Sequence, residues 1–139
     1  MLLVDTSVWS LALRRRRPVA SPHVDRFREA LTTGEVILTG IVMQELLQNL
    51  GDGNVKEGIV TELDKLPLLV PERGDHRDAA EVYTTCRRRG VQVGTVDALI
   101  AALCLRRDLD LLSTDRDFEH MAQFTELKLW DTGTASPPE

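Results

Sequence analysis

Short apolar runs alternate along this chain with longer stretches in which apolar residues recur every three or four positions. A run of three to five apolar residues is typical of a buried strand, whereas the recurring pattern predicts a helix with one buried face. The predicted strands are Leu2–Asp5, Val36–Leu38, Leu68–Val70, Leu109–Ser113 and Leu127–Trp130. The predicted helices are Thr6–Leu13, Pro22–Leu31, Gly40–Leu50, Val55–Leu66, Asp75–Arg89, Val96–Arg107 and Arg116–Met121.

Local signals support several of these boundaries. Ser21 before Pro22 is the pattern of an N-cap followed by proline in the first helical turn. Gly34 and Gly51 end two of the predicted helices, and Thr95 is expected to cap the helix that starts at Val96. Strands that alternate with helices predict a three-layer α/β domain with a mainly parallel sheet of about five strands flanked by helices. We expect one domain over residues 1–131 and a flexible tail over residues 132–139.

Composition narrows the class of protein. With 139 residues, 42% of them hydrophobic and 28% charged, the chain fits one globular domain. Its longest strictly apolar run, residues 98–105, is far shorter than the ~18 residues of a membrane span. The first residues, MLLVDTSVW, lack the basic region of a signal peptide. We therefore expect a cytoplasmic protein with no membrane segment, in which Cys86 and Cys104 are free thiols.

Charge gives two interpretations for the arginines. The net charge of −5 argues against a protein that coats nucleic acid through bulk positive charge. Only three of the 17 basic residues are lysines, and the arginines cluster at Arg14–Arg17, Arg87–Arg89 and Arg106–Arg107. A guanidinium group suits phosphates, so the first two runs are candidate RNA contacts. Solvated cations at helix ends, where they complement the helix dipole, are the alternative.

Four acidic residues, Asp5, Glu45, Asp97 and Asp115, carry the candidate chemistry. Three of them lie where an element starts or ends, and Glu45 lies at the border of the apolar face of its helix. Because the carboxyl ends of parallel strands share one edge of a sheet, these distant acids are expected to converge there. Carboxylate oxygens are the ligands that Mg²⁺ or Mn²⁺ prefers, so the sequence predicts a metal site.

Each acid also has a simpler explanation. Asp5 and Asp115 could cap the helices that follow them, and Asp97 could interact with a helix dipole. Asp117 could be a fifth ligand or an exposed acid in a first helical turn.

Four segments resemble the PIN-domain nucleases, and within them the VapC toxins: VDTSVW at residues 4–9, Glu45 within IVMQELLQ, TVDALIAA at 95–102 and LLSTDRDF at 111–118. They occur in the order of that family and span nearly the whole domain. The resemblance implies a Mg²⁺-dependent endoribonuclease that acts as a toxin, forms a homodimer and is blocked by a VapB-type antitoxin. It implies an acidic quartet of Asp5, Glu45, Asp97 and Asp115, with Thr6, Ser7 and Thr114 as hydroxyl residues beside it and Asp117 as an additional acid.

A mechanism follows from the residue types. No arrangement of a nucleophile with histidine stands out, so we expect water to attack phosphorus after activation by a metal ion held by Asp5 and Asp97. Glu45 and Asp115 would complete the coordination or orient water.

Two other functions stay open at this point. One is a phosphoryl-transfer hydrolase of another α/β family with Asp5 as nucleophile, which would need a second acid at position 7 and a downstream lysine. The other is a non-catalytic module that interacts with nucleic acid or protein and keeps the acids as caps. The motifs also do not distinguish RNA from DNA, because that choice depends on contacts with the 2′-OH.

Overall fold

The computed structural model describes residues 1–14 and 20–131. Its centre is a parallel sheet with the strand order β3-β2-β1-β4. The strands are β1 (Leu2–Val4), β2 (Val36–Thr39), β3 (Leu68–Leu69) and β4 (Asp110–Leu112). Leu3 of β1 pairs with Ile37 on one side and with Leu111 on the other. Every residue of β1 is buried because helices cover both faces of the sheet, which explains its unbroken apolar sequence.

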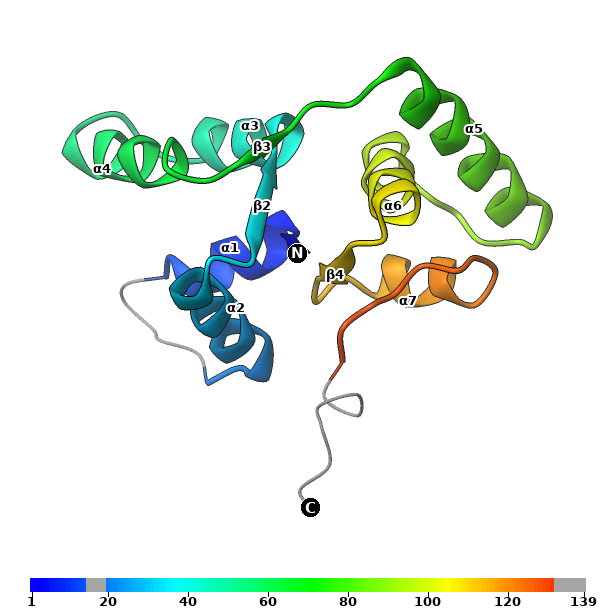
Figure 1. Ribbon diagram of the computed structural model, residues 1–139, viewed down its shortest axis with the longest axis horizontal. Coiled ribbons are helices and arrows are strands. Elements are labelled where there is room, and N and C mark those ends of the chain that lie inside the picture. The colour runs from blue at the N-terminus through cyan, green and yellow to red at the C-terminus, as the bar shows by residue number, and fades with distance from the viewer. Residues whose placement is uncertain (15–19, 132–139) are drawn as a thin grey trace.

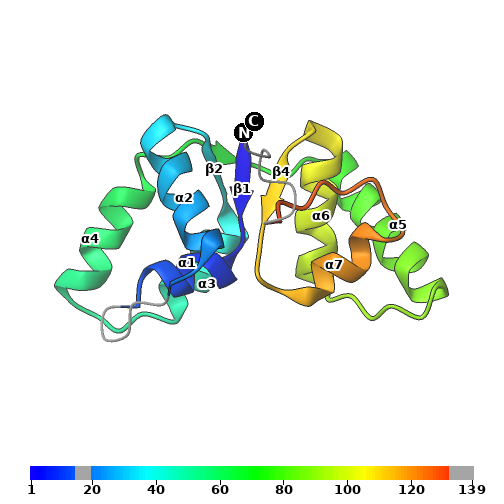
Figure 2. The ribbon, with the colours of Figure 1, turned by 90° about the horizontal axis from the view of Figure 1, so that it is seen from below.

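The helices lie on two sides of this sheet (Figure 1 and Figure 2). On one side are α1 (Thr6–Ala12), α2 (Pro22–Thr33), α3 (Gly40–Gln48) and α4 (Asn54–Leu63). On the other are α5 (Arg73–Arg88), α6 (Thr95–Arg107) and α7 (Arg116–Ala122). The predicted three-layer α/β architecture is confirmed.

Most predicted helix ends lie within one residue of the observed ends. The Ser21 hydroxyl accepts a hydrogen bond from the backbone N–H of Val24 at 3.4 Å, and Gly34 ends α2 with a φ of 73°. At two ends the capping residue differs from the predicted one. Helix α3 stops at Gln48 with Asn49 as its C-cap, before Gly51 is reached. Helix α6 begins at Thr95 itself, so the N-cap position belongs to Gly94 and the prediction of a Thr95 cap is wrong.

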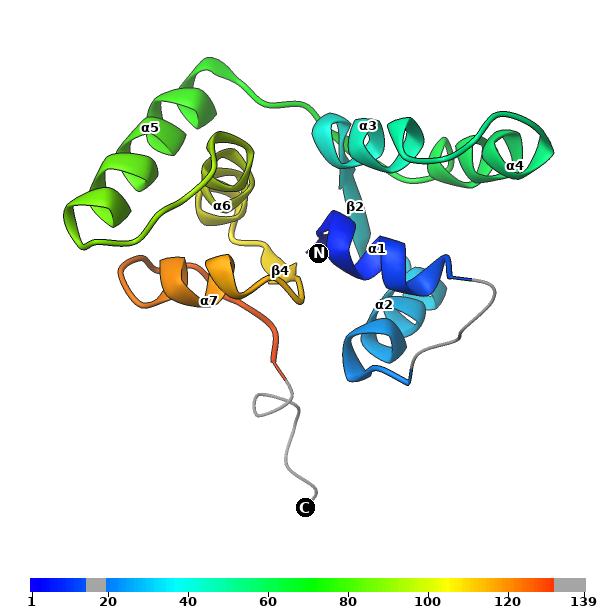
Figure 3. The same ribbon diagram turned by 180° about the vertical axis from the view of Figure 1, so that it is seen from behind.

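The predicted fifth strand, Leu127–Trp130, is reduced to a single parallel bridge between Leu111 and Leu129. The Leu111 N–H donates to the Lys128 carbonyl and the Trp130 N–H donates to the Leu111 carbonyl, both at 2.9 Å. The segment follows α7 and returns past it toward β4 (Figure 3), where it pairs over too short a length to form a strand. The described sheet therefore has four strands instead of about five. The predicted tail, residues 132–139, lies outside the described residues.

Apolar packing on both sides of the sheet and a backbone hydrogen bond hold the strand ends near which the acids lie. Buried side chains such as Phe27 pack on one side of the sheet, and Ile100 and Phe118 pack on the other. At the carboxyl ends of the paired strands β1 and β4, the Asp5 N–H donates to the Leu112 carbonyl at 2.9 Å. This bond holds the residues that follow β1 against those that follow β4. Both cysteines are free, as predicted, and both are buried.

None of the helices within residues 1–14 and 20–131 combines the length and apolar character needed to cross a membrane.

Candidate metal centre

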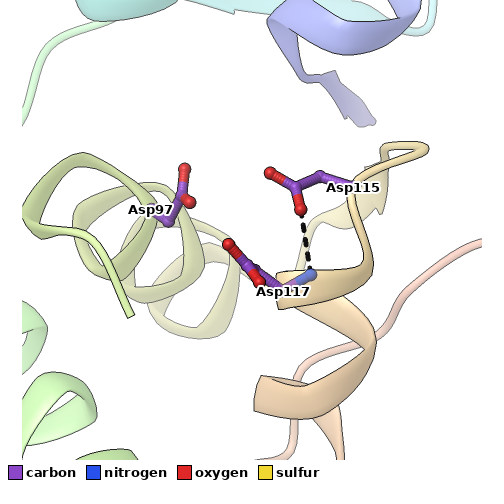
Figure 4. Close-up of side chains that lie close together, drawn as sticks. All are labelled: Asp97, Asp115 and Asp117. Carbon is purple, nitrogen blue, oxygen red and sulfur yellow. Dashed lines mark hydrogen bonds between the residues drawn. The ribbon is translucent and has the colours of Figure 1, made fainter. Parts of the chain in front are cut away.

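Three carboxylates meet where α6 and α7 begin (Figure 4). Asp97 lies in the first turn of α6, Asp115 is the N-cap residue of α7, and Asp117 lies in the first turn of α7. One oxygen from each lies within 4.8 Å of the other two. Asp115 Oδ1 also accepts the Asp117 N–H at 2.9 Å. The capping role considered for Asp115 therefore exists, and it coexists with a place in the cluster.

Asp5 lies on the neighbouring strand end with a buried side chain. Its Oδ2 accepts two hydrogen bonds, from the Ser7 hydroxyl at 2.9 Å and from the Ser113 hydroxyl at 2.8 Å. Although Asp5 occupies the N-cap position of α1, its side chain makes no cap hydrogen bond to the described backbone. Capping therefore does not account for this buried carboxylate.

Glu45 reaches the same region from α3. It is half-buried, as its place at the border of the apolar face predicted. Its Oε1 accepts a hydrogen bond from the Thr6 hydroxyl at 3.3 Å, across 39 positions of sequence. This contact links α3 to the start of α1 and orients the Glu45 carboxylate.

The hydroxyl residues connect the strand ends. Ser113 Oγ donates to Asp5 and accepts the Asp115 N–H at 3.0 Å, so one buried hydroxyl joins two of the acids. Ser7 Oγ accepts the Thr114 N–H at 3.1 Å, which means that Thr114 contributes its backbone rather than its exposed side chain to this contact. Ser113 was missed by the sequence analysis. Its position directly after the apolar end of β4 was the available signal.

The other four acids all act electrostatically on Asp97. The pKa of Asp97 is raised to about 6, first by burial and then by the negative charges of Asp5, Asp115, Asp117 and Glu45. Across residues 1–14 and 20–131, no arginine or lysine forms an ion pair with any of these acids. The cluster therefore carries negative charge that no ion pair of the described chain balances.

This donor set fits a divalent metal ion. All the available ligands are carboxylate or hydroxyl oxygens, which suit hard cations such as Mg²⁺ and Mn²⁺ rather than softer metals. A cation would also offset the mutual repulsion of the carboxylates, which at ~4 Å amounts to about 4 kcal/mol per pair at an effective dielectric constant of ~20.

An enzyme that forms an aspartyl-phosphate on Asp5 would need a second acid at position 7 and a lysine near the site. Position 7 is a serine that donates to Asp5 rather than a second acid. Each lysine pairs elsewhere: Lys128 with Asp108, Lys65 with Glu62 and Lys56 with Asp52. The structure thus gives no support to Asp5 as a phosphorylated nucleophile.

The three arginine runs differ in their exposure and in their ion pairs. Arg87, Arg88 and Arg89 are exposed at the end of α5, and Arg14 is exposed after α1. Arg15, Arg16 and Arg17 lie outside the described residues. Arg106 and Arg107 pair with the buried Asp75 and are structural.

Comparison with known proteins agrees with this geometry. The chain is 31% identical to Ribonuclease VapC11 of Mycobacterium tuberculosis over 130 residues, which cover 92% of this chain and 96% of that protein. Its fold is similar to FitAcB from Neisseria gonorrhoeae, with a TM-score of 0.72 at 21% identity over 97% of this chain and 100% of that one. It is also similar to DNA-bound VapBC from Salmonella typhimurium, with a TM-score of 0.70 at 19% identity over 94% and 96% of the two chains. At these identities the two structures show the shared fold alone. The family model of the PIN domain matches residues 2–123, and the chain therefore belongs to the PIN domain family.

Proposed function

We propose that this protein is a Mg²⁺-dependent endoribonuclease that acts as the toxin of a toxin–antitoxin pair. The observation that carries the proposal is a set of five acids from four separate elements or their ends, in which four act on the fifth, Asp97, at one edge of the sheet. Membership of the PIN domain family and the 31% identity to a protein named as a ribonuclease support RNA as the substrate.

Some residues of the site would bind the metal ion, and others would position those ligands. Asp5, Glu45, Asp97 and Asp115 would hold the ion, with Asp117 as a further ligand or as a group that positions water. When bound there, Mg²⁺ or Mn²⁺ would lower the pKa of a water molecule and would stabilise charge on the phosphate and leaving oxygens. Ser7 and Ser113 hold the Asp5 carboxylate in place, and Thr6 does the same for Glu45.

The first test compares two Asp→Asn variants that each remove one negative charge. Asp97→Asn should reduce cleavage of single-stranded RNA in Mg²⁺ by more than about 100-fold, since even residues behind the ligands of a metal can be worth up to about 100-fold. Asp52→Asn changes a fully exposed carboxylate outside the cluster and should keep wild-type activity. Cleavage by the wild type that persists in excess EDTA, or full activity of Asp97→Asn, would refute the metal-dependent mechanism. Absence of cleavage by the wild type in Mg²⁺ would favour a non-catalytic module.

An inhibitory partner belongs to the same proposal, because uncontrolled cleavage of RNA harms the host. An apolar cavity of about 570 Å³ lies between α1, α2 and the end of α4, and its lining includes Trp9, Leu13, Phe27 and Leu31.

We predict that a VapB-type antitoxin covers this cavity and places an arginine or another cation among the acids. Solved VapBC and FitAB complexes of similar fold support pairing of this kind. Expression of this chain alone should arrest growth, and co-expression of the antitoxin should restore it. Harmless expression of soluble wild type would refute the toxin role. A homodimer stays a prediction, which the mass of the purified protein in solution tests.

A further inference from the structure

A second cavity opens beside the acidic cluster. It has a volume of about 460 Å³ and lies between the end of α5, the loop that follows it and the starts of α6 and α7. Asp117 belongs both to its lining and to the three-carboxylate cluster. Gly94 forms another part of the wall, and a side chain at Gly94 would begin 3.9 Å from Asp97 Oδ2. Whatever enters this cavity therefore lies next to the candidate metal ligands.

The lining offers a combination of groups that the acidic cluster lacks. Tyr83 is half-buried, and its hydroxyl accepts a hydrogen bond from Arg87 Nη1 at 3.4 Å. Val91 and Val93 add apolar surface, and Gln92 adds an exposed amide with both donors and an acceptor. One cavity thus contains an aromatic ring, aliphatic walls, an amide and a cation.

These groups match the parts of a nucleotide. A base can stack on an aromatic ring, its edge can hydrogen-bond to an amide, and an arginine can contact the adjoining phosphate. Arg87 can also act electrostatically. The acids repel a phosphate that approaches the cluster, and the positive charge of Arg87 opposes that repulsion. A cation on the cavity wall lowers that repulsion on the side where the strand would lie.

On this basis, and resting on the proposed RNA cleavage, we propose that the cavity binds the base of a nucleotide that flanks the scissile phosphate. Tyr83 stacks on that base, and Arg87 contacts the backbone phosphate beside it. Both are binding residues that set which nucleotide is accepted next to the cut.

The stacking role is tested with abasic RNA. The cleavage site of wild type in one RNA oligonucleotide is mapped first, and each base flanking the cut is then removed in turn. Loss of the base that occupies the cavity should lower kcat/KM of wild type by about 5-fold to 100-fold, the range of base–aromatic stacking. In Tyr83→Leu the intact oligonucleotide should already be cleaved more slowly, and removal of the same base should cause no further loss. Tyr83→Phe keeps the ring and should respond as wild type does.

The phosphate contact is tested with neighbouring arginines. Arg87 lines the cavity, whereas Arg88 is equally exposed and is not part of its lining. Arg87→Gln should weaken RNA binding and reduce the slope of log K against log salt by about 0.7, the value for one phosphate contact on a single strand. Arg88→Gln removes the same charge and should leave the slope unchanged. Melting temperatures of all variants check that the fold survives.

The two levels of the proposal fail differently. If wild type does not cleave RNA in Mg²⁺, the proposed function is refuted and the inference falls with it. If wild type cleaves RNA but every abasic position affects wild type and Tyr83→Leu equally, only the cavity assignment is refuted. The same holds if the Tyr83 and Arg87 variants change inhibition by the antitoxin and leave RNA cleavage unaltered.

Discussion

At the scale of the residue, the behaviour of Asp97 is set by its surroundings. An isolated aspartate has a pKa of about 3.9, whereas burial and four neighbouring negative charges raise that of Asp97 to about 6. The folded protein therefore holds a proton on Asp97 at pH values where the unfolded chain has lost it. The contribution of this group to stability is greatest below about pH 4 and falls as the pH rises through about 6.

Asp97→Asn should consequently raise the melting temperature of the metal-free protein at neutral pH, because it removes the charge that the other acids repel. Allowing for solvent screening of a group that is only partly buried, the gain in unfolding free energy should be on the order of 1 kcal/mol, or about 3 °C. The measurement is thermal unfolding of wild type and variant in EDTA and in saturating Mg²⁺.

Mg²⁺ provides the control for that comparison. It should stabilise wild type because it binds the folded state, and this increment should be lost in Asp97→Asn. A variant that melts below wild type in EDTA and keeps the full increment would identify Asp97 as a structural residue.

Ser113 gives a second prediction at this scale. Ser113→Ala removes the hydroxyl that donates to Asp5 and accepts from Asp115. Because a buried carboxylate then loses one of its two hydroxyl donors, unfolding free energy should fall by about 1–3 kcal/mol and cleavage should slow. Ser10→Ala, which alters an exposed serine of α1, is the matched control and should change neither quantity. Unchanged cleavage in Ser113→Ala would show that Asp5 keeps its position without this contact.

At the scale of the element, an ion pair with a buried carboxylate joins α5 to α6. The Asp75 side chain is fully buried and accepts from Arg107 Nη1 at 2.5 Å and Nη2 at 2.8 Å. Arg106 Nε lies 2.9 Å from Asp75 Oδ1, and the Glu72 N–H donates to Oδ2 at 2.6 Å. These partners, Arg107 foremost, lower the pKa of Asp75 to about 2. This ion pair, together with apolar packing, holds α6, the helix that carries Asp97, against α5.

Asp75→Asn should lower unfolding free energy by about 1.5–3 kcal/mol at neutral pH, because the buried side chain loses its charge-assisted hydrogen bonds to the partly exposed Arg107. Asp78→Asn is the control: Asp78 lies on the same helix but pairs with Arg106 at the surface, where a pair is worth at most about 1 kcal/mol. Urea unfolding of both variants measures the difference. Equal effects would show that the buried pair has no special weight.

The same pair predicts a pH dependence of opposite sign to that of Asp97. A carboxylate with a lowered folded-state pKa stabilises the protein above its unfolded pKa of about 3.9, and that contribution is lost as the pH falls through about 2. The stability gap between wild type and Asp75→Asn should therefore be constant above about pH 5 and narrow between about pH 4 and pH 2. A gap that stayed constant through that range would contradict the assignment.

At the scale of the whole molecule, the acidic edge and the apolar cavity at Trp9 are separate surfaces. This separation predicts variants that cleave RNA but escape inhibition. Leu31 lines the apolar cavity and is 41% exposed, so Leu31→Asp should weaken antitoxin binding while RNA cleavage persists. Val70→Asp places the same charge on another exposed apolar residue, outside that cavity, and should be inhibited as wild type is. Cleavage assays titrated with antitoxin measure both. Equal inhibition of the two variants would locate the antitoxin elsewhere.

The sequence alone determined most of the local structure, and it indicated which acids converge at one edge of the sheet. Apolar runs and recurrences, together with caps such as Ser21 and Gly34, act within a few residues of the chain, so they specify helices and strands without knowledge of the rest. Parallel strand order then implied that residues following β1 and β4, including Asp5 and Asp115, share one edge.

Only the tertiary structure decided which groups meet across large sequence separations. The hydrogen bond from Ser113 to Asp5 spans 108 positions, and the bond from Arg107 to Asp75 spans 32. Neither pair has a local signature, because such contacts depend on how whole elements pack. The same reason explains why the segment Leu127–Trp130, strand-like by its own pattern, forms a single bridge, and why the cavity at Tyr83 could not be foreseen. Local chemistry set what each residue can do, and packing between distant elements set which residues do it together.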